Sequence, residues 1–489
     1  MSSLNGESRL LIDGQLVEAR SGKRYPNFDP ATEAIIGEVA DAGVEDADAA
    51  IAAARRAFDT TDWSTNVALR KRCLIQLRDG LRALAPDLRE QVVAEVGAPM
   101  AITANGPQGD GPIAILDYCI ELLDTYAWDS ELPVVNTMGV PSKRLIWKEA
   151  AGVVAAISPW NFPFQINLAK VGPALAAGCA VILKSAPETP FTATILGKVV
   201  ADSTDIPPGI FNVLTASDPA AIGEKLVADP RVDLVSFTGS TQTGRRIMAS
   251  AAGTVKRVFL ELGGKSANII LDDADFNTAL LSGLAVCYHA GQGCAIPTRI
   301  LLPASRYEEG VQTLKAMFGY IQPGDQRREQ QIMGPLISKK QQQRVLAYIA
   351  LGQQEGARLV CGGGVPAGLD KGYFVEPTLF ADVRNDMRIA QEEIFGPVLV
   401  AIAYQDDDDA IRIANDSIYG LSGSIYSADQ DRALRMARRI RTGTMNINGA
   451  NFFAPDSPFG GYKQSGIGRE MGIPGFEEYL ETKTVAIPG

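Results

Sequence analysis

Five short apolar runs alternate with helix-like segments between residues 152 and 271, and this alternation constrains the fold most. The runs are Val153–Ser158, Ala180–Lys184, Phe211–Leu214, Val232–Phe237 and Val258–Glu261. Helical spacing of apolar residues predicts helices over 165–177, up to 200, over 220–228 and over 244–252. Repeated strand–helix–strand units form a parallel sheet with helices on both faces. The sequence therefore predicts an α/β protein whose ligand binds at the carboxyl ends of the strands.

The flanking regions predict further domains, because 489 residues exceed what one core usually holds. The first part of the chain, to about residue 130, is expected to be helical, with helices over 44–58 and 68–96 and a break near Pro86. Short β-like runs at 132–135 and 145–148 predict a hairpin. A second α/β pattern begins after Ala267 and continues to about Gly449.

Composition excludes several functions. The net charge of −11 disfavours nucleic acid and anionic membranes as partners. Six cysteines without paired spacing favour a reducing, cytoplasmic compartment over disulfides or a zinc site. A single histidine disfavours a multi-histidine metal site, so we expect no metal. No signal peptide and no membrane-spanning run are expected.

The segment Gly291-Gln292-Gly293-Cys294 predicts a nucleophile. It follows an apolar, helix-like run, and the glycines remove bulk around the thiol. Glu261 offers a carboxylate base, as an activated nucleophile requires. The alternative is a small core cysteine, which is the interpretation we give to the other five.

Polar residues also follow the predicted strands. Asn161, held between aromatic residues and prolines, is a candidate donor to an oxyanion, or a turn asparagine. Lys184 could reach ribose hydroxyls or a phosphate, or face solvent. Gly239 and Ser240 could begin a helix whose N–H groups hold a phosphate, although a Gly-x-Gly-x-x-Gly fingerprint is absent. Glu261 is either a partly buried base or a surface carboxylate.

Two further features have competing interpretations. His289 could pair with a Cys294 thiolate, but residues i and i+5 of a regular helix point in different directions, so we predict a structural role. The aromatic and glycine-rich segment 458–463, with Phe452 and Phe453, predicts core packing or a loop over a substrate channel.

Together these motifs resemble the aldehyde dehydrogenase superfamily, NAD(P)-dependent and non-phosphorylating. The resemblance covers nearly the whole chain and includes six motifs in order. They are Pro159–Pro163, Phe237–Thr241, Glu261–Ser266, Gly291–Cys294, Glu392–Pro397 and Ser457–Lys463.

The resemblance implies the aldehyde dehydrogenase fold. This comprises a Rossmann-like parallel-sheet cofactor domain (1–130 and 151–262), an α/β catalytic domain (263–455) and a small β bridging element (131–150 and 465–489). The bridging element would join subunits into a homodimer or homotetramer through paired strand edges.

The resemblance also implies roles for individual residues. Cys294 would attack the aldehyde, Asn161 and the Cys294 N–H would hold the oxyanion, and Glu261 would activate water. The expected cofactor residues are Ile157, Trp160, Lys184, Glu188, Gly239, Ser240, Leu262, Glu393 and Phe395. The expected substrate-tunnel residues are Phe162, Tyr288, Phe453 and Phe459.

The sequence departs from its relatives at two positions. Many NAD-using relatives carry a glutamate three residues after the strand-end lysine, whereas here Pro187 occupies that position and Glu188 follows. NAD is therefore expected, with NADP possible. The position of His289 is often asparagine in relatives.

The predicted activity is NAD(P)-dependent oxidation of an apolar or aromatic aldehyde to a carboxylic acid, through a thiohemiacetal and an acyl thioester on cysteine. Two alternatives remain: a CoA-acylating semialdehyde dehydrogenase, in which CoA replaces water, and a catalytically idle homologue that only binds or supports structure.

Overall fold

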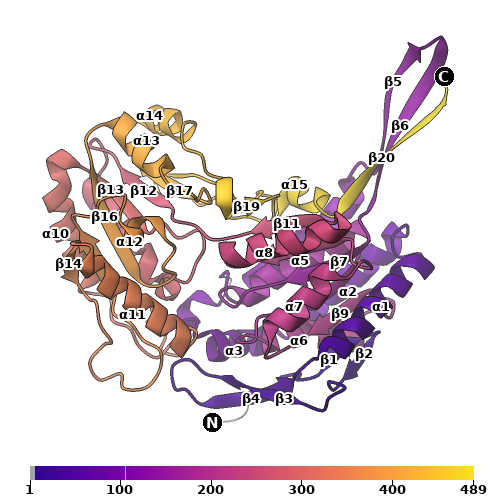
Figure 1. Cartoon of the computed structure of the whole chain (residues 1–489), viewed down its shortest axis with the longest axis horizontal. Coiled ribbons are helices and arrows are strands. Elements are labelled where there is room, and N and C mark those ends of the chain that lie inside the picture. The colour runs from indigo at the N-terminus through magenta and orange to yellow at the C-terminus, as the bar shows by residue number, and fades with distance from the viewer. Residues whose placement is uncertain (1–5, 105) are drawn as a thin grey trace.

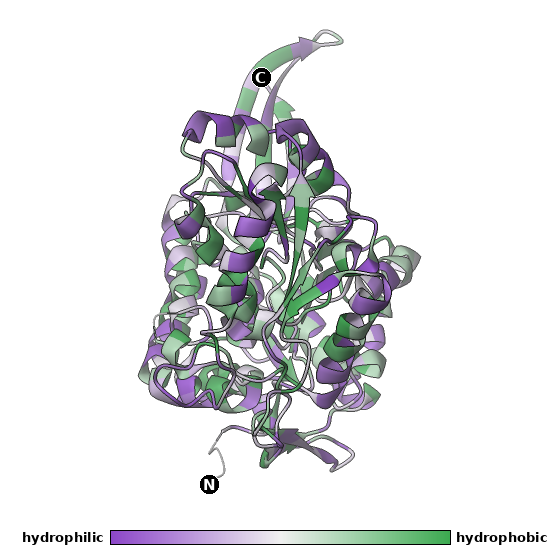
Figure 2. Ribbon diagram, turned by 90° about the vertical axis from the view of Figure 1, so that its left-hand side faces the viewer, coloured by the Kyte–Doolittle hydropathy of each residue, from purple (hydrophilic) through white to green (hydrophobic). Residues whose placement is uncertain are grey.

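Two lobes and a projecting arm make up the molecule (Figure 1). The computed structural model describes residues 6–104 and 106–489. An eight-stranded sheet lies in one lobe, a seven-stranded sheet in the other, and three strands form the arm. Hydrophobic residues follow the interior strands, whereas hydrophilic residues gather on the outward faces of the helices (Figure 2).

The first sheet has the order β19-β11-β10-β7-β8-β9-β1-β2. Its parallel centre confirms the five predicted strands. They are β7 (Val153–Ile157), β8 (Ala180–Lys184), β9 (Phe211–Leu214), β10 (Leu234–Thr238) and β11 (Arg257–Glu261). The covering helices are α5 (Pro163–Ala177), α6 (Phe191–Ser203), α7 (Pro219–Ala228) and α8 (Thr241–Ala251).

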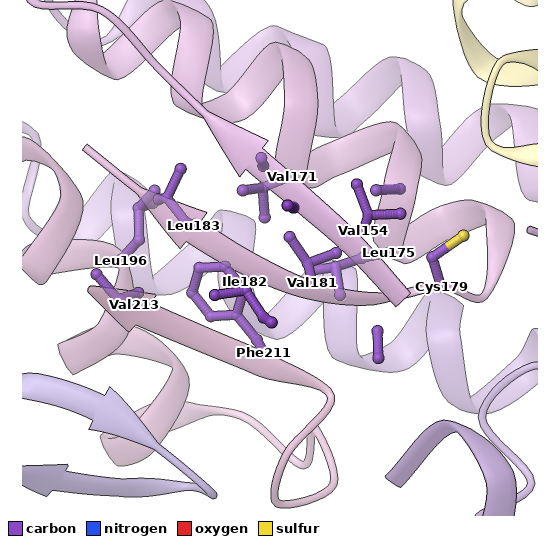
Figure 3. Packing of buried hydrophobic residues seen from close by; sticks show 14 of the residues in the cluster. Val154, Val171, Leu175, Cys179, Val181, Ile182, Leu183, Leu196, Phe211 and Val213 are labelled. Carbon is purple, nitrogen blue, oxygen red and sulfur yellow. The ribbon is translucent and has the colours of Figure 1, made fainter. Parts of the chain in front are cut away.

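Packing explains why these runs read as continuously apolar in the sequence. Every residue of β7 and β8 is buried, since helices cover both faces of the sheet. Figure 3 shows Val171 and Leu175 of α5 and Leu196 of α6 packed against residues of these strands and β9. The α5 helix is itself buried along almost its whole length.

The N-terminal region corrects the helical expectation. Residues 10–40 form strands: β1 (Leu10–Ile12), β2 (Gln15–Val17), β3 (Arg24–Phe28) and β4 (Ile35–Ala40). The prediction was wrong there because strands this short carry too few residues to show a period. The helices that follow were predicted correctly, including the break at Pro86: α1 (Val44–Thr60), α2 (Val67–Ala83) and α3 (Ala85–Val96). Helix α4 (Ala114–Thr125) completes this region.

The second sheet confirms the second α/β pattern and has the order β14-β15-β16-β13-β12-β17-β18. Its strands are β12 (Ala267–Ile270), β13 (Arg299–Pro303), β14 (Arg358–Cys361), β15 (Thr378–Ala381), β16 (Val398–Tyr404), β17 (Gly423–Tyr426) and β18 (Asn446–Ile447). Its helices are α9 (Phe276–Leu280), α10 (Tyr307–Phe318), α11 (Lys339–Gln354), α12 (Arg388–Gln391), α13 (Asp407–Asn415) and α14 (Gln430–Ala437).

The arm contains the predicted hairpin, β5 (Asp129–Thr137) and β6 (Val140–Ala150), and the C-terminal strand β20 (Leu480–Pro488). Strand β20 pairs antiparallel with β6 over nine residues, from Leu480 opposite Ala150 to Pro488 opposite Ser142. The arm extends away from both lobes (Figure 1). Strand β19 (Gly466–Ile467) instead pairs with β11 in the first sheet, and helix α15 (Gly472–Glu477) follows it. The division of the chain into three domains stays a prediction.

Neither a membrane helix nor a metal cluster is found within the described part of the chain. None of its helices combines the length and apolarity needed to cross a membrane. In the same residues, no three potential metal ligands of the histidine, cysteine or carboxylate kind gather in one place.

Candidate active site

The register of the first sheet brings the predicted strand ends together. Ile157 lies opposite Lys184 on one side and Phe237 on the other, and Thr238 lies opposite Glu261. Strand β7 is first in chain order among the parallel strands, yet lies between β8 and β10. The order in which successive strands are added therefore reverses at β7, and open α/β sheets bind ligands at such a point.

Two cavities form a continuous cleft along this edge, with volumes of about 430 and 410 Å³. Trp160, Gly239 and Ser240 line both. The first also contains Ile157, Lys184 and Glu188, and the second Leu262, Glu393 and Phe395. All nine predicted cofactor residues thus line one cleft.

A third cavity, of about 740 Å³, lies beyond Cys294 and Glu261, and we call it the tunnel. All four predicted substrate residues line it: Phe162, Tyr288, Phe453 and Phe459. Cys294 and Glu261 line both the tunnel and the nearer part of the cleft. These two side chains therefore stand where the cavities meet.

The segment before Cys294 is not the regular helix that the sequence suggested. Tyr288 is extended (φ −64°, ψ 125°), and His289, Ala290 and Gly291 follow with φ of 49°, 51° and 72°. Histidine and asparagine both occur more readily than most residues in this left-handed region. The positive φ at position 289 therefore suits both the histidine of this chain and the asparagine that the sequence analysis expects in relatives. A Cβ on Gly291 would lie 2.1 Å from the carbonyl oxygen of Gly396, so the loop also needs glycine for close packing.

Gln292 holds this loop in place, a role that the sequence analysis missed. Its Oε1 accepts the N–H of Ile337 at 2.9 Å, and its Nε2 donates to the His289 carbonyl at 3.2 Å. This side chain has no exposed area and lies between two glycines next to Cys294, so it can hold the loop in place. Its position between glycines was the only sequence signal for this role.

Asn161 is fixed beside the loop that carries Cys294. Its Nδ2 donates to the Gln292 carbonyl at 3.0 Å, and its own carbonyl accepts from Gln108 Nε2 at 2.7 Å. A side-chain amide has two N–H bonds. One therefore anchors Asn161, and the second remains for an oxygen near Cys294.

Glu261 is 1% exposed, and its Oε1 has no hydrogen-bond partner in the described chain. Burial raises the pKa of this carboxyl well above its usual value, Glu470 raises it further, and Lys170 opposes the rise. Burial, followed by the nearby Glu261 carboxylate, also raises the pKa of the Cys294 thiol. Two acidic groups thus meet in surroundings that disfavour charge, so an ionised Glu261 carboxylate is a stronger base than an exposed one.

A buried ion pair, also missed by the sequence analysis, lies behind Glu261. Lys170 Nζ contacts Glu470 Oε1 at 2.6 Å and donates to Ser236 Oγ at 3.1 Å. Lys170 has no exposed side-chain area, and Glu470 has 5%. A single lysine within the apolar α5 sequence was the available signal, but its partner lies 300 residues away.

The second lobe supplies the opposite wall of the cleft. Glu393 Oε1 accepts the N–H of Gly264 at 3.0 Å, and burial raises the pKa of Glu393 to about 7. A Cβ on Gly263 would lie 2.4 Å from Glu393 Oε2, so glycine permits this approach. The rings of Trp160 and Phe395 meet edge to face across the cleft, with centroids 5.3 Å apart.

The far end of the cleft fits a ligand with hydroxyl and phosphate groups. Burial lowers the pKa of Lys184 to about 8, an effect opposed by Glu188. The hydroxyls of Ser158 and Thr238 are buried in the cleft wall without a partner among the described residues. Ser240 caps α8 by accepting the N–H of Thr243 at 3.2 Å. A helix start facing the cavity suits a phosphate.

His289 lies close to Cys294 in the chain without forming an ion pair with it. It is fully buried, and burial lowers its pKa to about 4, so the ring is neutral near pH 7. The ring meets Phe162 edge to face at 5.5 Å. Neither ring nitrogen has a hydrogen-bond partner in the part of the chain that the structure describes. The predicted structural role stays a prediction, and these contacts favour it.

Comparisons with known proteins identify the class. The model of the aldehyde dehydrogenase family matches residues 16–485. A Pseudomonas sp. protein named 3-succinoylsemialdehyde-pyridine dehydrogenase is 43% identical, with 97% of each chain covered. A Pseudomonas syringae aldehyde dehydrogenase C variant, solved with NAD+ and octanal, superposes with a TM-score of 0.93 at 38% identity and covers 99% of this chain and 98% of its own. A Mycobacterium tuberculosis aldehyde dehydrogenase solved with NAD+ also gives 0.93, at 41% identity and 98% of each chain.

The chain belongs to the aldehyde dehydrogenase family. It has the aldehyde dehydrogenase fold and is an oxidoreductase that acts on the aldehyde group, as the sequence predicted.

Proposed function

We propose that this protein uses NAD to oxidise an apolar or aromatic aldehyde to the carboxylic acid, through a thioester on Cys294. One observation carries the proposal: Cys294 and Glu261 line both the cofactor-type cleft and the tunnel. A substrate in the tunnel and a nicotinamide in the cleft would meet at the thiol.

The residues divide the reaction into two halves. The Cys294 thiol loses its proton to solvent and its sulfur adds to the aldehyde carbon, giving a thiohemiacetal oxyanion. The second N–H of Asn161 and the backbone N–H of Cys294 then stabilise the oxyanion. A bound NAD+ would supply the acceptor for the hydride of this carbon, and the acyl thioester on Cys294 would remain. Glu261 finally takes a proton from the water that hydrolyses the thioester.

Three features support NAD as the cofactor. Both solved relatives described above contain NAD+. Lys184 and the start of α8 suit a ribose and a diphosphate, and Glu188 places negative charge near Lys184. NADP stays possible because Pro187, which also lines this end of the cleft, offers no carboxylate to repel a 2′-phosphate.

The tunnel favours an uncharged substrate. Among the described residues that line it, none is arginine or lysine. Its walls include Phe162, Phe453 and Phe459, and Phe452 stacks on Phe459 with centroids 5.5 Å apart. An apolar or aromatic aldehyde gains more from such walls than a charged semialdehyde does.

The unpaired oxygen of Glu261 favours hydrolysis over transfer to CoA. The test is NADH absorbance with octanal and with phenylacetaldehyde, each with and without CoA. We expect NADH without CoA and a free acid as product. An absolute requirement for CoA would support the CoA-acylating alternative, and the absence of NADH with every aldehyde tried would support an idle homologue.

We also propose that the arm joins subunits into a homodimer or homotetramer. Its hairpin exposes large apolar residues, among them Val134, Met138 and Val140. Deleting residues 480–489 removes the strand that pairs with β6, and should lower the mass measured by light scattering. An unchanged mass would exclude this strand from assembly.

The reaction needs a reduced Cys294 thiol, which favours a cytoplasmic location for the protein.

A further inference from the structure

Helix α5 presents one polar side chain to the tunnel among apolar neighbours. Phe162, Gln165, Ile166 and Ala169 line the tunnel, at the i, i+3, i+4 and i+7 spacing of one helix face. Phe162 precedes the helix and adjoins Asn161. The helical rise places Gln165 about 5 Å farther along the axis than Phe162. Gln165 therefore lies about one helical turn beyond the residue that adjoins Asn161.

The Gln165 amide makes no hydrogen bond to the rest of the described chain. Its Oε1 is buried without a partner, and its Nε2 has none either. A buried polar group without a partner is costly, and the Nε2 of the same amide can bond water only while the tunnel is open. A substrate that fills the tunnel displaces this water and must replace its hydrogen bond or leave the amide unpaired.

The other polar groups of the tunnel already have roles, with one exception. Glu470 pairs with Lys170, and Asn451 accepts the N–H of Phe453 at 3.0 Å. The Tyr288 hydroxyl has no hydrogen-bond partner among the described residues. Burial raises the pKa of Tyr288 to about 12, so the hydroxyl keeps its proton near neutral pH.

We infer that Gln165, assisted by Tyr288, selects aldehydes whose aromatic or apolar body carries a hydroxyl group. This inference rests on the proposed function and names its substrate class more closely. A side-chain amide turned by 180° exchanges its donor and acceptor. A hydroxyl can pair with either atom, because it both donates and accepts. A site built to bond such a group rejects the analogue that lacks it, since its own amide is then left unpaired.

The test compares kcat/KM for phenylacetaldehydes that carry either a hydroxyl or a fluorine at the meta or the para position. The two substituents are similar in size, so their ratio isolates hydrogen bonding. The ratio is measured within one preparation, so the fraction of folded enzyme cancels. Each substituent also changes the intrinsic reactivity of the aldehyde group. This change is the same for wild type and variant, so it cancels when their hydroxyl-to-fluorine ratios are compared.

Gln165→Met retains the length of the side chain and removes the amide. We expect the hydroxyl-to-fluorine ratio to fall about tenfold at one ring position, equivalent to about 1.4 kcal/mol. Tyr288→Phe should lower the same ratio by a smaller factor. The control is Phe453→Leu, which changes an apolar wall of the same tunnel and should leave the ratio within about twofold.

Ratios within about twofold of wild type in both Gln165→Met and Tyr288→Phe, at both ring positions, would overturn the inference. A fall as large in Phe453→Leu would also overturn it, because tunnel shape would then be the cause. Loss of NADH formation with all these aldehydes in the wild type would instead count against the proposed function. The two failures are thus distinguishable.

Discussion

The cleft and the tunnel meet at Cys294 but are built in different ways. Parallel strand ends supply much of the cleft, so Lys184 and Glu261 reach one edge through the register of β7, β8, β10 and β11. The tunnel takes its walls from one face of α5 and from loops far apart in the chain, around Pro112 and Phe453. Backbone topology therefore positions the reacting groups, whereas side-chain packing determines which aldehyde enters.

Removing the nucleophile should have the largest effect, because Cys294 belongs to both cavities. In Cys294→Ala we expect turnover to fall by more than about a thousandfold, since the covalent route is lost. Binding of NAD, measured by fluorescence titration, should remain, because Cys294 occupies only one part of the cleft. Cys361→Ala is the matched control, as its half-buried thiol lies outside all three cavities and should be dispensable.

Substituting Glu261 should separate the two half-reactions. In Glu261→Gln a rapid burst of NADH should precede a steady rate about a hundredfold lower, because the amide cannot accept a proton from water. Full steady-state activity of this variant near neutral pH would assign the base to another group.

The pH profile checks the same residue. In the proposed reaction, hydrolysis requires the Glu261 carboxylate, whose pKa is raised by burial. The rate should therefore increase with pH through a value above the usual glutamate range and be lost below it. This acidic limb should be absent from the slow phase of Glu261→Gln. A limb that persists unchanged in the variant would mean that Glu261 does not titrate in this step.

The same contrast explains what the sequence could predict. Lys184, Gly239 and Glu261 each follow an apolar run, so their shared edge could be inferred from strand order alone. The left-handed turn at His289 and Ala290 could not, because the apolar residues before it imitate a helix. Nor could the Lys170–Glu470 pair, since long-range contacts leave no period in the chain. Aromatic residues predicted the tunnel wall, but Gln165 gave no signal until its missing partner was visible.

Two single substitutions should affect one cavity each. In Gly263→Ala the new Cβ would press on the Glu393 carboxylate in the cleft, so KM for NAD should increase about tenfold while KM for the aldehyde changes little.

In Phe459→Leu the stack on Phe452 in the tunnel is lost, so KM for aromatic aldehydes should increase several-fold while KM for NAD stays unchanged. Steady-state kinetics with each substrate varied in turn measure both. If either variant changes both KM values equally, the two cavities do not act separately.

Cofactor choice should show the smallest effect, because it depends on one charge at the far end of the cleft. Pro187 has neither a side-chain acceptor nor an N–H to bind ribose hydroxyls. Glu188 is half-buried beside it, and both Lys184 and Lys340 lower its pKa against the rise caused by burial. A carboxylate there should bind ribose hydroxyls and repel a 2′-phosphate. The binding free energy should therefore favour NAD over NADP by about one to two kcal/mol. Glu188→Gln keeps the size of the side chain and removes its charge, and should narrow the NAD-to-NADP ratio of kcat/KM several-fold.

Lys340→Met should have the opposite effect, since this lysine lines the same cavity from the second lobe and its positive charge favours a phosphate. Loss of the lysine should therefore increase the NAD-to-NADP ratio of kcat/KM. If Glu188→Gln leaves the ratio unmoved, the carboxylate does not face the ribose, and selection between the cofactors depends on another part of the cleft wall.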